Sequence, residues 1–392
     1  MKKVVSRLII IVLLFSILFL TSCDALSKVV NFVTKNEVVI NNITYTKYKH
    51  GYALTSAGKA VTNSTLSNLV IPGTVKGKPV LRIESNAFRK ISWLLSVVIP
   101  DSVTSMGQNA FYDCTVRNVV IGDGLRVIQS KAFASCNSLI NVELGASVDS
   151  IGEYAFENCT SLNTVVIPNS VTSIKRGAFK DCTSLKSVVI GSSVKTIDAS
   201  AFENCTALEG VVIGSSVNTI GASAFKNCTA LAGVLMGSSV KTIGDSAFEN
   251  CSSLLGVEIG LSAETIGNKA FKNCTALEVA VIGSSVNTIG DSAFENCTSL
   301  EGVVMGNSVK TIGQYAFNGC ISLTRFDIPA SVAKIGFSAF RGCKALTDVY
   351  FVMHARWKLN DFVYLQAYEL SDSQEAAKFL TSTHYAYTWI RG

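Results

Sequence analysis

Apolar residues recur along most of this chain at a fixed spacing of 23 positions. The dipeptide Ala-Phe occurs twelve times between residues 87 and 340, and ten of its eleven intervals are 23 residues long. In one unit, CTSLKSVVIGSSVKTIDASAFEN, polar or small residues separate the apolar ones, which are Leu185, Val188, Ile190, Val194, Ile197 and Phe202. A unit this short cannot enclose a core alone. The pattern therefore predicts stacked units that share one continuous core, as in a solenoid.

Each repeat divides into three predicted elements. The β-branched run Val188–Ile190 favours a short strand, and a turn former follows it, which is proline in four repeats and glycine in the others up to Gly306. Val194 and Ile197 indicate a second, less regular strand, and a short helical turn is expected to carry the Ala-Phe pair. We expect a repeat solenoid, β-rich with short helical turns, of about 12 to 13 turns of 23 residues and capped at both ends.

The N-terminal segment reads as an export signal. Basic residues at positions 2, 3 and 7 flank an apolar run over residues 8–20, which is too short to cross a bilayer comfortably. The run ends in Leu20-Thr21-Ser22-Cys23, which resembles the lipobox of bacterial lipoproteins, whose cysteine is acylated. By that resemblance residues 1–22 are a lipoprotein signal peptide and Cys23 carries the lipid. The alternative is an ordinary signal peptide with a chance cysteine.

The repeat array sets the remaining domain boundaries. We expect a lipidated tether over residues 23–35, an N-terminal β cap over 36–64, the repeats over 65–351 and a C-terminal cap over 352–392. In the C-terminal cap, Asp372 followed by Glu375 predicts the start of a short helix that ends at about Leu380. Residues 384–390 alternate in polarity as a strand would.

Composition narrows the classes of function. The 392 residues are 48% hydrophobic and 16% charged with a formal net charge of +6, which excludes a disordered tail and gives no sign of a nucleic-acid binder. The three histidines, His50, His354 and His384, fall in the caps, and the chain has no nucleophile–histidine–acid grouping and no Gly-rich phosphate loop. We therefore expect no enzyme activity, no cofactor and no metal.

The twelve cysteines follow the repeat. Eleven of them, from Cys114 to Cys343, stand three residues after a repeat phenylalanine, and Cys23 is the twelfth. Structural zinc needs closely paired ligands such as Cys-x-x-Cys, which the chain lacks, and parallel stacked side chains lie too far apart for regular disulfides. The spacing predicts buried free thiols that act as small apolar groups.

Two polar columns run beside the phenylalanines. The charges that follow the phenylalanines alternate in sign over seven repeats, at Glu157, Lys180, Glu203, Lys226, Glu249, Lys272 and Glu295. A slip by one repeat would place like charges together, so we interpret this column as structural. The alternative is a stripe of charges that recognises a partner. Asparagine or aspartate precedes most cysteines, which indicates a ladder of amides that satisfies turn backbone groups. The Asn-Cys-Thr triplets are formally glycosylation sequons, an interpretation that we disfavour.

The outward position of the first strand is unusually apolar. It holds Val98, Val120, Glu143, Val166, Val189, Val212, Leu235, Glu258, Val281, Val304, Asp327 and Tyr350. The position two residues earlier is small in the central repeats, where it holds Gly210, Gly233, Gly256 and Gly302. Exposed strand positions are normally polar, so the two columns form a candidate partner-binding face. The alternative is that valine stands there for its strand propensity alone.

Four aromatic residues near the C-terminus form a second candidate site. They are Trp357, Tyr385, Tyr387 and Trp389. Such side chains stack on sugars or peptides, but a lid over the exposed apolar end of the last repeat is the simpler role.

The repeat pattern Cys-x-x-Leu-x-x-Val-x-Ile-Pro-x-Ser-Val-x-x-Ile-Gly-x-x-Ala-Phe resembles the BspA-like bacterial leucine-rich repeats over residues 66–351. The resemblance implies a curved, lipid-tethered leucine-rich repeat protein of the outer membrane or cell surface that catalyses nothing. It implies a protein partner, from the host matrix or another bacterial cell, with the lipid anchor as its membrane contact and no nucleic acid. Two alternatives stay open, namely a structural envelope protein facing the periplasm and a glycan-binding module.

Overall fold

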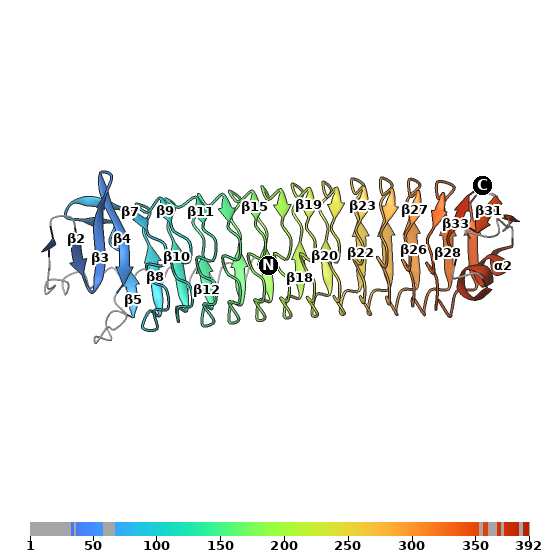
Figure 1. Cartoon of the computed structure of the whole chain (residues 1–392), viewed down its shortest axis with the longest axis horizontal. Helices are drawn as coiled ribbons and strands as arrows, with labels where there is room; N and C mark the ends of the chain where they lie inside the picture. Colours follow the sequence, from blue (N-terminus) through green and yellow to red (C-terminus); the bar gives the residue numbers. More distant parts are fainter. Residues whose placement is uncertain are drawn as a thin grey trace, which may run out of the picture.

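The computed structural model describes residues 33–34, 37–57, 67–352, 356–359, 367–369, 372–383 and 387–391. Figure 1 shows a long rod in which successive 23-residue turns, here called coils, stack in chain order. The predicted β-solenoid is therefore confirmed. The rod is nearly straight in this view, so the curvature implied by the family resemblance is slight.

The first strands of the coils form a parallel sheet of eleven strands, here called the first sheet. Equivalent residues of adjacent coils pair, as Val188 does with Val211 and Val189 with Val212. Two further parallel strands, β28 (Arg325–Ile328) and β30 (Asp348–Phe351), follow in the last coils. The eleven strands are β5 (Asn68–Val70), β8 (Ser96–Ile99), β10 (Asn118–Ile121), β12 (Asn141–Glu143), β14 (Thr164–Val166), β16 (Ser187–Val189), β18 (Gly210–Val212), β20 (Gly233–Leu235), β22 (Gly256–Ile259), β24 (Val279–Ile282) and β26 (Gly302–Met305).

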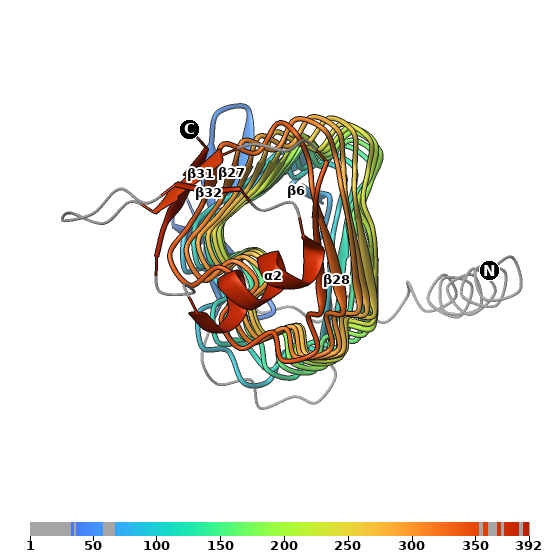
Figure 2. The same ribbon diagram turned by 90° about the vertical axis from the view of Figure 1, so that its right-hand side faces the viewer.

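Short second strands line another wall of the coil, here called the second sheet, and Figure 2 shows the two walls end-on. Each of these strands has two residues, of which one is buried, such as Ile197 or Ile220. They are β11 (Val127–Ile128), β13 (Ser150–Ile151), β15 (Ser173–Ile174), β17 (Thr196–Ile197), β19 (Thr219–Ile220), β21 (Thr242–Ile243), β23 (Thr265–Ile266), β25 (Thr288–Ile289), β27 (Thr311–Ile312) and β29 (Lys334–Ile335).

The Ala-Phe segment is a run of tight turns. Around Phe156 the amides of Ala155, Glu157 and Cys159 bond to carbonyls three residues earlier. Tyr154 and Asn158, on either side, have positive φ angles of 57° and 59°. Residues in the left-handed region cannot continue a right-handed helix, so the short helical turn that we expected here is a turn instead.

Phenylalanine rings form the centre of the core. Adjacent rings of the ladder from Phe88 to Phe340 stack with centroids 4.7–5.5 Å apart and planes within 11°. Each cysteine from Cys114 to Cys343 donates its thiol to the carbonyl of the phenylalanine one coil earlier, at 2.7–3.2 Å. All eleven of these cysteines are buried and free, as the spacing predicts.

Antiparallel strands close the N-terminal end of the rod. They are β1 (Val33–Thr34), β2 (Glu37–Ile40), β3 (Ile43–Tyr48) and β4 (Gly51–Ala57). Strand β4 pairs in parallel with β7 (Lys78–Ile83), which pairs with β6 (Thr74–Val75) and with β9 (Ser105–Met106). The cap's sheet thereby ends at β9, the strand that precedes, by one coil, the first strand of the second sheet, β11.

The C-terminal end is closed by α2 (Ser373–Lys378), a π-helical turn (Phe379–Thr383) and strands β31 (Arg356–Leu359), β32 (Ala367–Glu369) and β33 (Trp389–Arg391). Figure 2 shows α2 lying across the last coil. The Asp372 side chain accepts from the amides of Gln374 and Glu375 at 2.8 Å, which is the predicted helix start. Strand β33 pairs antiparallel with β29 and covers the free edge of the second sheet.

Candidate functional site

The outward column of the first sheet forms a continuous line of apolar side chains, here called the ridge. Strand register places equivalent residues side by side, and Val166, Val189 and Val212 are 57–58% exposed while Leu235 is 69% exposed. Val120, Val304 and Tyr350 are also exposed, whereas Val98 and Val281 are half-buried. The carboxylates of Glu143, Glu258 and Asp327 interrupt the ridge. The predicted partner-binding residues thus lie on one wall of the rod.

A shallow depression of about 490 Å³ runs beside the ridge. We call it the trough; its lining residues are Val188, Gly210, Val211, Val212, Ala232, Gly233, Val234, Leu235 and Gly256. Its floor consists of glycines whose backbone does not have a positive φ. A Cβ atom at Gly233 would meet nothing within 4 Å, and one at Gly210 would come no closer than 3.7 Å to another atom. The backbone therefore has no steric need for glycine here.

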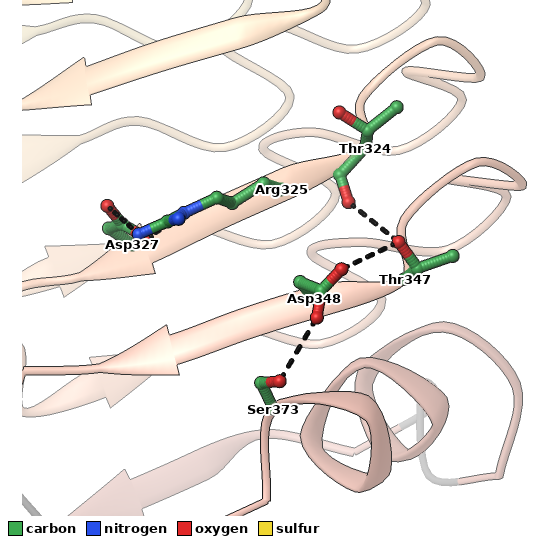
Figure 3. A network of polar contacts seen from close by, with 6 residues as sticks. All are labelled: Thr324, Arg325, Asp327, Thr347, Asp348 and Ser373. Atoms are coloured by element: carbon green, nitrogen blue, oxygen red, sulfur yellow. Dashed lines mark hydrogen bonds and ion pairs between the residues drawn. The ribbon is translucent and has the colours of Figure 1, made fainter.

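The C-terminal end of the ridge carries a polar network, which Figure 3 shows. Arg325 donates from its Nε to Asp327 at 2.9 Å, and its guanidinium lies 4.3 Å from the ring centroid of Tyr350. The guanidinium thereby covers one face of the Tyr350 ring.

In the same network, the Thr347 hydroxyl is 3.4 Å from the Thr324 carbonyl and 2.9 Å from an Asp348 carboxylate oxygen. The hydroxyl of Ser373 donates to the other Asp348 oxygen at 3.1 Å. These contacts attach the C-terminal cap to the last strand of the ridge, as Figure 3 shows. The end of the ridge is therefore held in place by the cap.

Of the four C-terminal aromatic residues, the structure describes the side chains of Tyr387 and Trp389, and neither is exposed. Trp389 is 1% exposed and its ring centroid lies 6.4 Å from that of Phe379. Tyr387 is half-buried against the same core. Trp357 stands on β31 opposite Arg391, and Tyr385 lies outside the described residues. A buried indole has no free face for a sugar, so these positions favour the role of a lid.

The charge column forms ion pairs at every second step. Lysine contacts the glutamate of the following coil in three pairs, which are Lys180–Glu203 at 3.1 Å, Lys226–Glu249 at 2.8 Å and Lys272–Glu295 at 2.7 Å. Among the described residues, no ion pair joins a glutamate of this column to the lysine that follows it. The alternation in sequence therefore gives separate pairs and not a continuous network.

Sequence reasoning missed two exposed leucines in the coil of Gly256. Leu255 is 54% exposed and Leu261 is 71% exposed, at positions where neighbouring repeats have mostly polar or small residues. A repeat-by-repeat comparison contains the signal, because the two repeats on either side have glutamate or alanine in place of Leu255 and serine or asparagine in place of Leu261. Leu255 is next to Gly256 in the chain and adds an exposed apolar side chain beside the trough, whereas Leu261 lies in the turn after β22.

Other candidate chemistry has little support in the described part of the chain. In the residues that the structure describes, no three histidine, cysteine, aspartate or glutamate side chains lie together as a metal ion would need. Within the same residues, no helix is long and apolar enough to span a bilayer. Cys23, His354 and His384 lie outside the described residues.

Comparison with known proteins identifies the repeat. The family model of the BspA type leucine rich repeat region matches residues 57–183, 149–278 and 264–363. A leucine-rich repeat protein from Bacteroides ovatus superposes with a TM-score of 0.61 at 28% identity, covering 80% of this chain and 88% of that one. The pneumococcal vaccine antigen PcpA has a TM-score of 0.50 at 20% identity, with 81% and 82% covered.

A leucine rich cell surface protein from Faecalibacterium prausnitzii has a TM-score of 0.49 at 25% identity, with 83% of this chain and 96% of that one covered. No curated protein matches the sequence. The family model spans well over half of the chain, and its repeat is the 23-residue coil described above. The chain therefore belongs to the BspA-type leucine-rich repeat family.

Proposed function

We propose that this protein is a non-enzymatic surface lipoprotein that adheres to host or neighbouring-cell proteins through the first-sheet wall. Leucine-rich repeat proteins generally mediate protein interaction, and BspA-like members are bacterial cell-surface proteins. The observation that carries the proposal is the ridge, in which four consecutive coils expose Val166, Val189, Val212 and Leu235 to solvent.

The alternative explanation of the ridge is strand propensity, and the trough argues against it. Valine is a good strand former and glycine a poor one, yet Gly210 and Val212 stand on the same strand, β18, and glycine recurs at the equivalent position of β20 and β22. Selection for sheet stability alone would replace Gly210, Gly233 and Gly256, because the open space above them admits a side chain. A need for a smooth, accessible apolar surface explains both columns.

The wall is large enough for a protein partner. Thirteen first strands about 4.8 Å apart give a face roughly 60 Å long. A standard protein interface buries about 800 Å² on each partner, which a wall of this length accommodates. The binding energy is then distributed over many coils, with the ridge at the centre of the contact.

The lipid anchor is the second part of the proposal. Cys23, after a signal peptide over residues 1–22, is the residue to be acylated. Metabolic labelling with an alkyne fatty acid is expected to label the native chain, whereas Cys23→Ser is expected to lose the label and to leave the membrane fraction. A Cys23→Ser variant that keeps the label would contradict the assignment.

Surface exposure decides between an adhesin and a periplasmic structural protein. Protease added to intact cells is expected to remove the repeats, and cells that lack the protein are expected to adhere less to immobilised extracellular-matrix proteins or to neighbouring bacteria. A periplasmic protein cleaved in parallel controls for leakage. A chain that stays intact until the outer membrane is opened cannot be an adhesin, and that result would overturn the proposal.

A further inference from the structure

Carboxylates surround the trough and continue beyond it. In the five coils from Glu209 to Val304, the exposed positions on the first strands and directly before them carry four glutamates and no lysine or arginine. Glu209, Glu278 and Glu301 stand in the column before the glycines, and Glu258 stands in the ridge column. The wall is therefore acidic in these coils, with Glu209 and Glu258 in coils of the trough and Glu278 and Glu301 beyond its end.

These four glutamates are available to a partner. All four side chains are exposed, and none is in an ion pair in the described structure. The first basic residue towards the N-terminus on this wall is Lys186, one coil before Glu209. Exposed unpaired carboxylates on a low-charge protein create a local negative potential that attracts cations.

The glycine floor indicates how closely a partner approaches. A glycine inside a strand weakens it and often marks a place where another backbone comes near. Nothing lies within 4 Å of the Cβ position at Gly233, and Val279 occupies the equivalent position two coils later. The trough therefore spans the coils of Gly210, Gly233 and Gly256 and ends at Val279.

We propose that the trough binds an extended protein segment in which apolar residues alternate with lysine or arginine. This inference rests on the proposed function and names the chemistry of its partner. The backbone of the segment lies over the glycines and continues past Val279, its apolar side chains contact Val212 and Leu235, and its cationic side chains point to the opposite side, towards Glu209, Glu278 and Glu301. A neutral or acidic segment leaves these carboxylates desolvated without a counter-charge, which weakens binding.

The dimensions fit such a segment. The coil of Glu209 and the coil of Glu301 are four steps apart, or about 19 Å at a strand spacing of about 4.8 Å. An extended chain covers that length with about six residues, of which every second points to the same side. Three cationic side chains can therefore reach carboxylates along one short segment.

The direct test uses the full chain in detergent and fluorescein-labelled nonapeptides. The first peptide alternates lysine with valine, the second replaces lysine with glutamate, and the third replaces valine with serine. Fluorescence anisotropy is expected to show at least tenfold tighter binding of the lysine–valine peptide than of either other peptide. Its affinity is expected to fall as salt is raised from 50 to 500 mM.

Variants of the protein locate the site. Gly233→Val fills the trough with a side chain that the fold already accepts at Val279. This variant is expected to bind the lysine–valine peptide at least tenfold more weakly than the native protein does. Glu209→Gln combined with Glu278→Gln is expected to weaken binding and to reduce its salt dependence. Glu264→Gln, an exposed carboxylate before β23 on the second-sheet wall, is the matched control and is expected to change nothing.

The outcomes separate this inference from the proposed function. Equal binding of the lysine–serine and lysine–valine peptides would show charge attraction without a trough, and binding unaffected by Gly233→Val would place the peptide elsewhere. Either result overturns the inference. If serine substitutions in the ridge still reduce adhesion in that case, the proposed function remains supported. If substitutions on the first-sheet wall leave adhesion unchanged, the proposed function is wrong, irrespective of the peptide results.

Discussion

The side-chain amide of Asn227 donates a hydrogen bond from its Nδ2 to Oδ1 of Asn204, one coil earlier, at 2.7 Å. The same bond repeats from Asn204 to Asp181 at 2.6 Å and onward through Asn250, Asn273 and Asn296 at 2.7–3.0 Å. Every amide in this ladder points the same way, so the bonds polarise one another. We expected the amides to satisfy turn backbone groups, and the structure shows that they bond to each other.

The first prediction concerns this ladder. Asn227→Gly breaks two rungs but suits the positive φ of 60°, and it is expected to lower the free energy of unfolding by about 1–3 kcal/mol. Asn227→Ala adds the cost of a Cβ in the left-handed region, about 1–2 kcal/mol more. Urea unfolding measures both. A glycine variant as stable as the native chain would mean that the ladder contributes nothing.

A second prediction concerns the phenylalanine ladder. Phe225 lies 5.3 Å from Phe202 and 5.2 Å from Phe248, centroid to centroid, and is fully buried. Phe225→Ala is expected to cost about 3–5 kcal/mol, because it leaves a cavity between two rings. Leu235→Ala, at an exposed position of the next coil, is the control and is expected to change stability by less than about 0.5 kcal/mol. Equal effects of the two changes in thermal unfolding would contradict the proposed core.

A third prediction follows from the buried thiols. Burial raises the pKa of nine cysteine thiols, and neighbouring thiols or carboxylates add to the increase. The pKa of Cys182, for example, is raised to about 12. An unfolded thiol titrates near about 8.5. Below that pH both states hold the proton. Above it the unfolded chain releases protons that the folded chain keeps, so stability falls as pH rises from about 8.5 towards the folded pKa.

The size of this effect is measurable. Each thiol contributes up to about 1.4 kcal/mol of destabilisation per pH unit above the unfolded pKa. Urea midpoints are expected to fall steeply between pH 8 and pH 9.5, and Cys205→Ala combined with Cys228→Ala is expected to make the slope shallower. A midpoint that stays constant over this range would show that the thiols titrate alike in both states.

A fourth prediction concerns the ion pairs of the charge column. Burial acts to raise the pKa of Glu249, but hydrogen bonds from Lys226 and Ser246 outweigh it and hold that pKa below its ordinary value. The pair therefore stabilises the fold above about pH 4.3, and the contribution is lost as pH falls through the lowered pKa. A double-mutant cycle of Lys226→Met and Glu249→Gln is expected to give a coupling of about 0.2–1 kcal/mol at pH 7 that disappears once the Glu249 carboxylate is protonated in acid.

The control for that cycle is Lys241, an exposed lysine without an ion pair in the described structure. Lys241→Met is expected to show no coupling to Glu249→Gln. A coupling well above about 1 kcal/mol would mean that the column stabilises the solenoid more strongly than surface pairs do.

Much of the fold follows from the spacing of the repeat. A period of 23 residues fixes the strand register, since Val188 can pair with Val211 only if whole coils stack. It also places Cys182 and Cys205 in equivalent buried positions, where Phe156 and Phe179 supply the carbonyl acceptors. Periodicity carries this information because identical coils have identical neighbours.

The turn around Phe156 shows what the sequence leaves open. Ala-Phe pairs suit a helix, and only the left-handed conformation of residues such as Tyr154 excludes one. Tyrosine seldom adopts that conformation, so backbone bonds to the next coil, such as Phe156 N–H to Ala178 at 2.8 Å, must hold it there. Contacts between coils decide the local structure, and a single repeat does not contain them.

The candidate site was predicted in part. Alternation in the strands identifies Val189 and Val212 as outward residues, and the structure exposes both. The depth of the trough and the exposure of Leu255 depend on how adjacent strands pack, which one-dimensional periodicity does not describe.

The most direct test of the central claim removes the ridge and measures binding and stability together. The variant carries Val166→Ser, Val189→Ser, Val212→Ser and Leu235→Ser in the full chain. Its control carries Thr→Ser at four exposed or half-buried second-sheet positions, which are Thr196, Thr219, Thr242 and Thr265. Both variants are compared with the native protein by urea unfolding and by binding to the matrix or cell-surface protein that the native chain binds most tightly.

We predict that the ridge variant unfolds in one cooperative transition near the native midpoint and that its affinity falls at least tenfold, while the control binds as the native protein does. Unchanged affinity in a folded ridge variant would contradict the account, because the valines would then serve the sheet and not a partner.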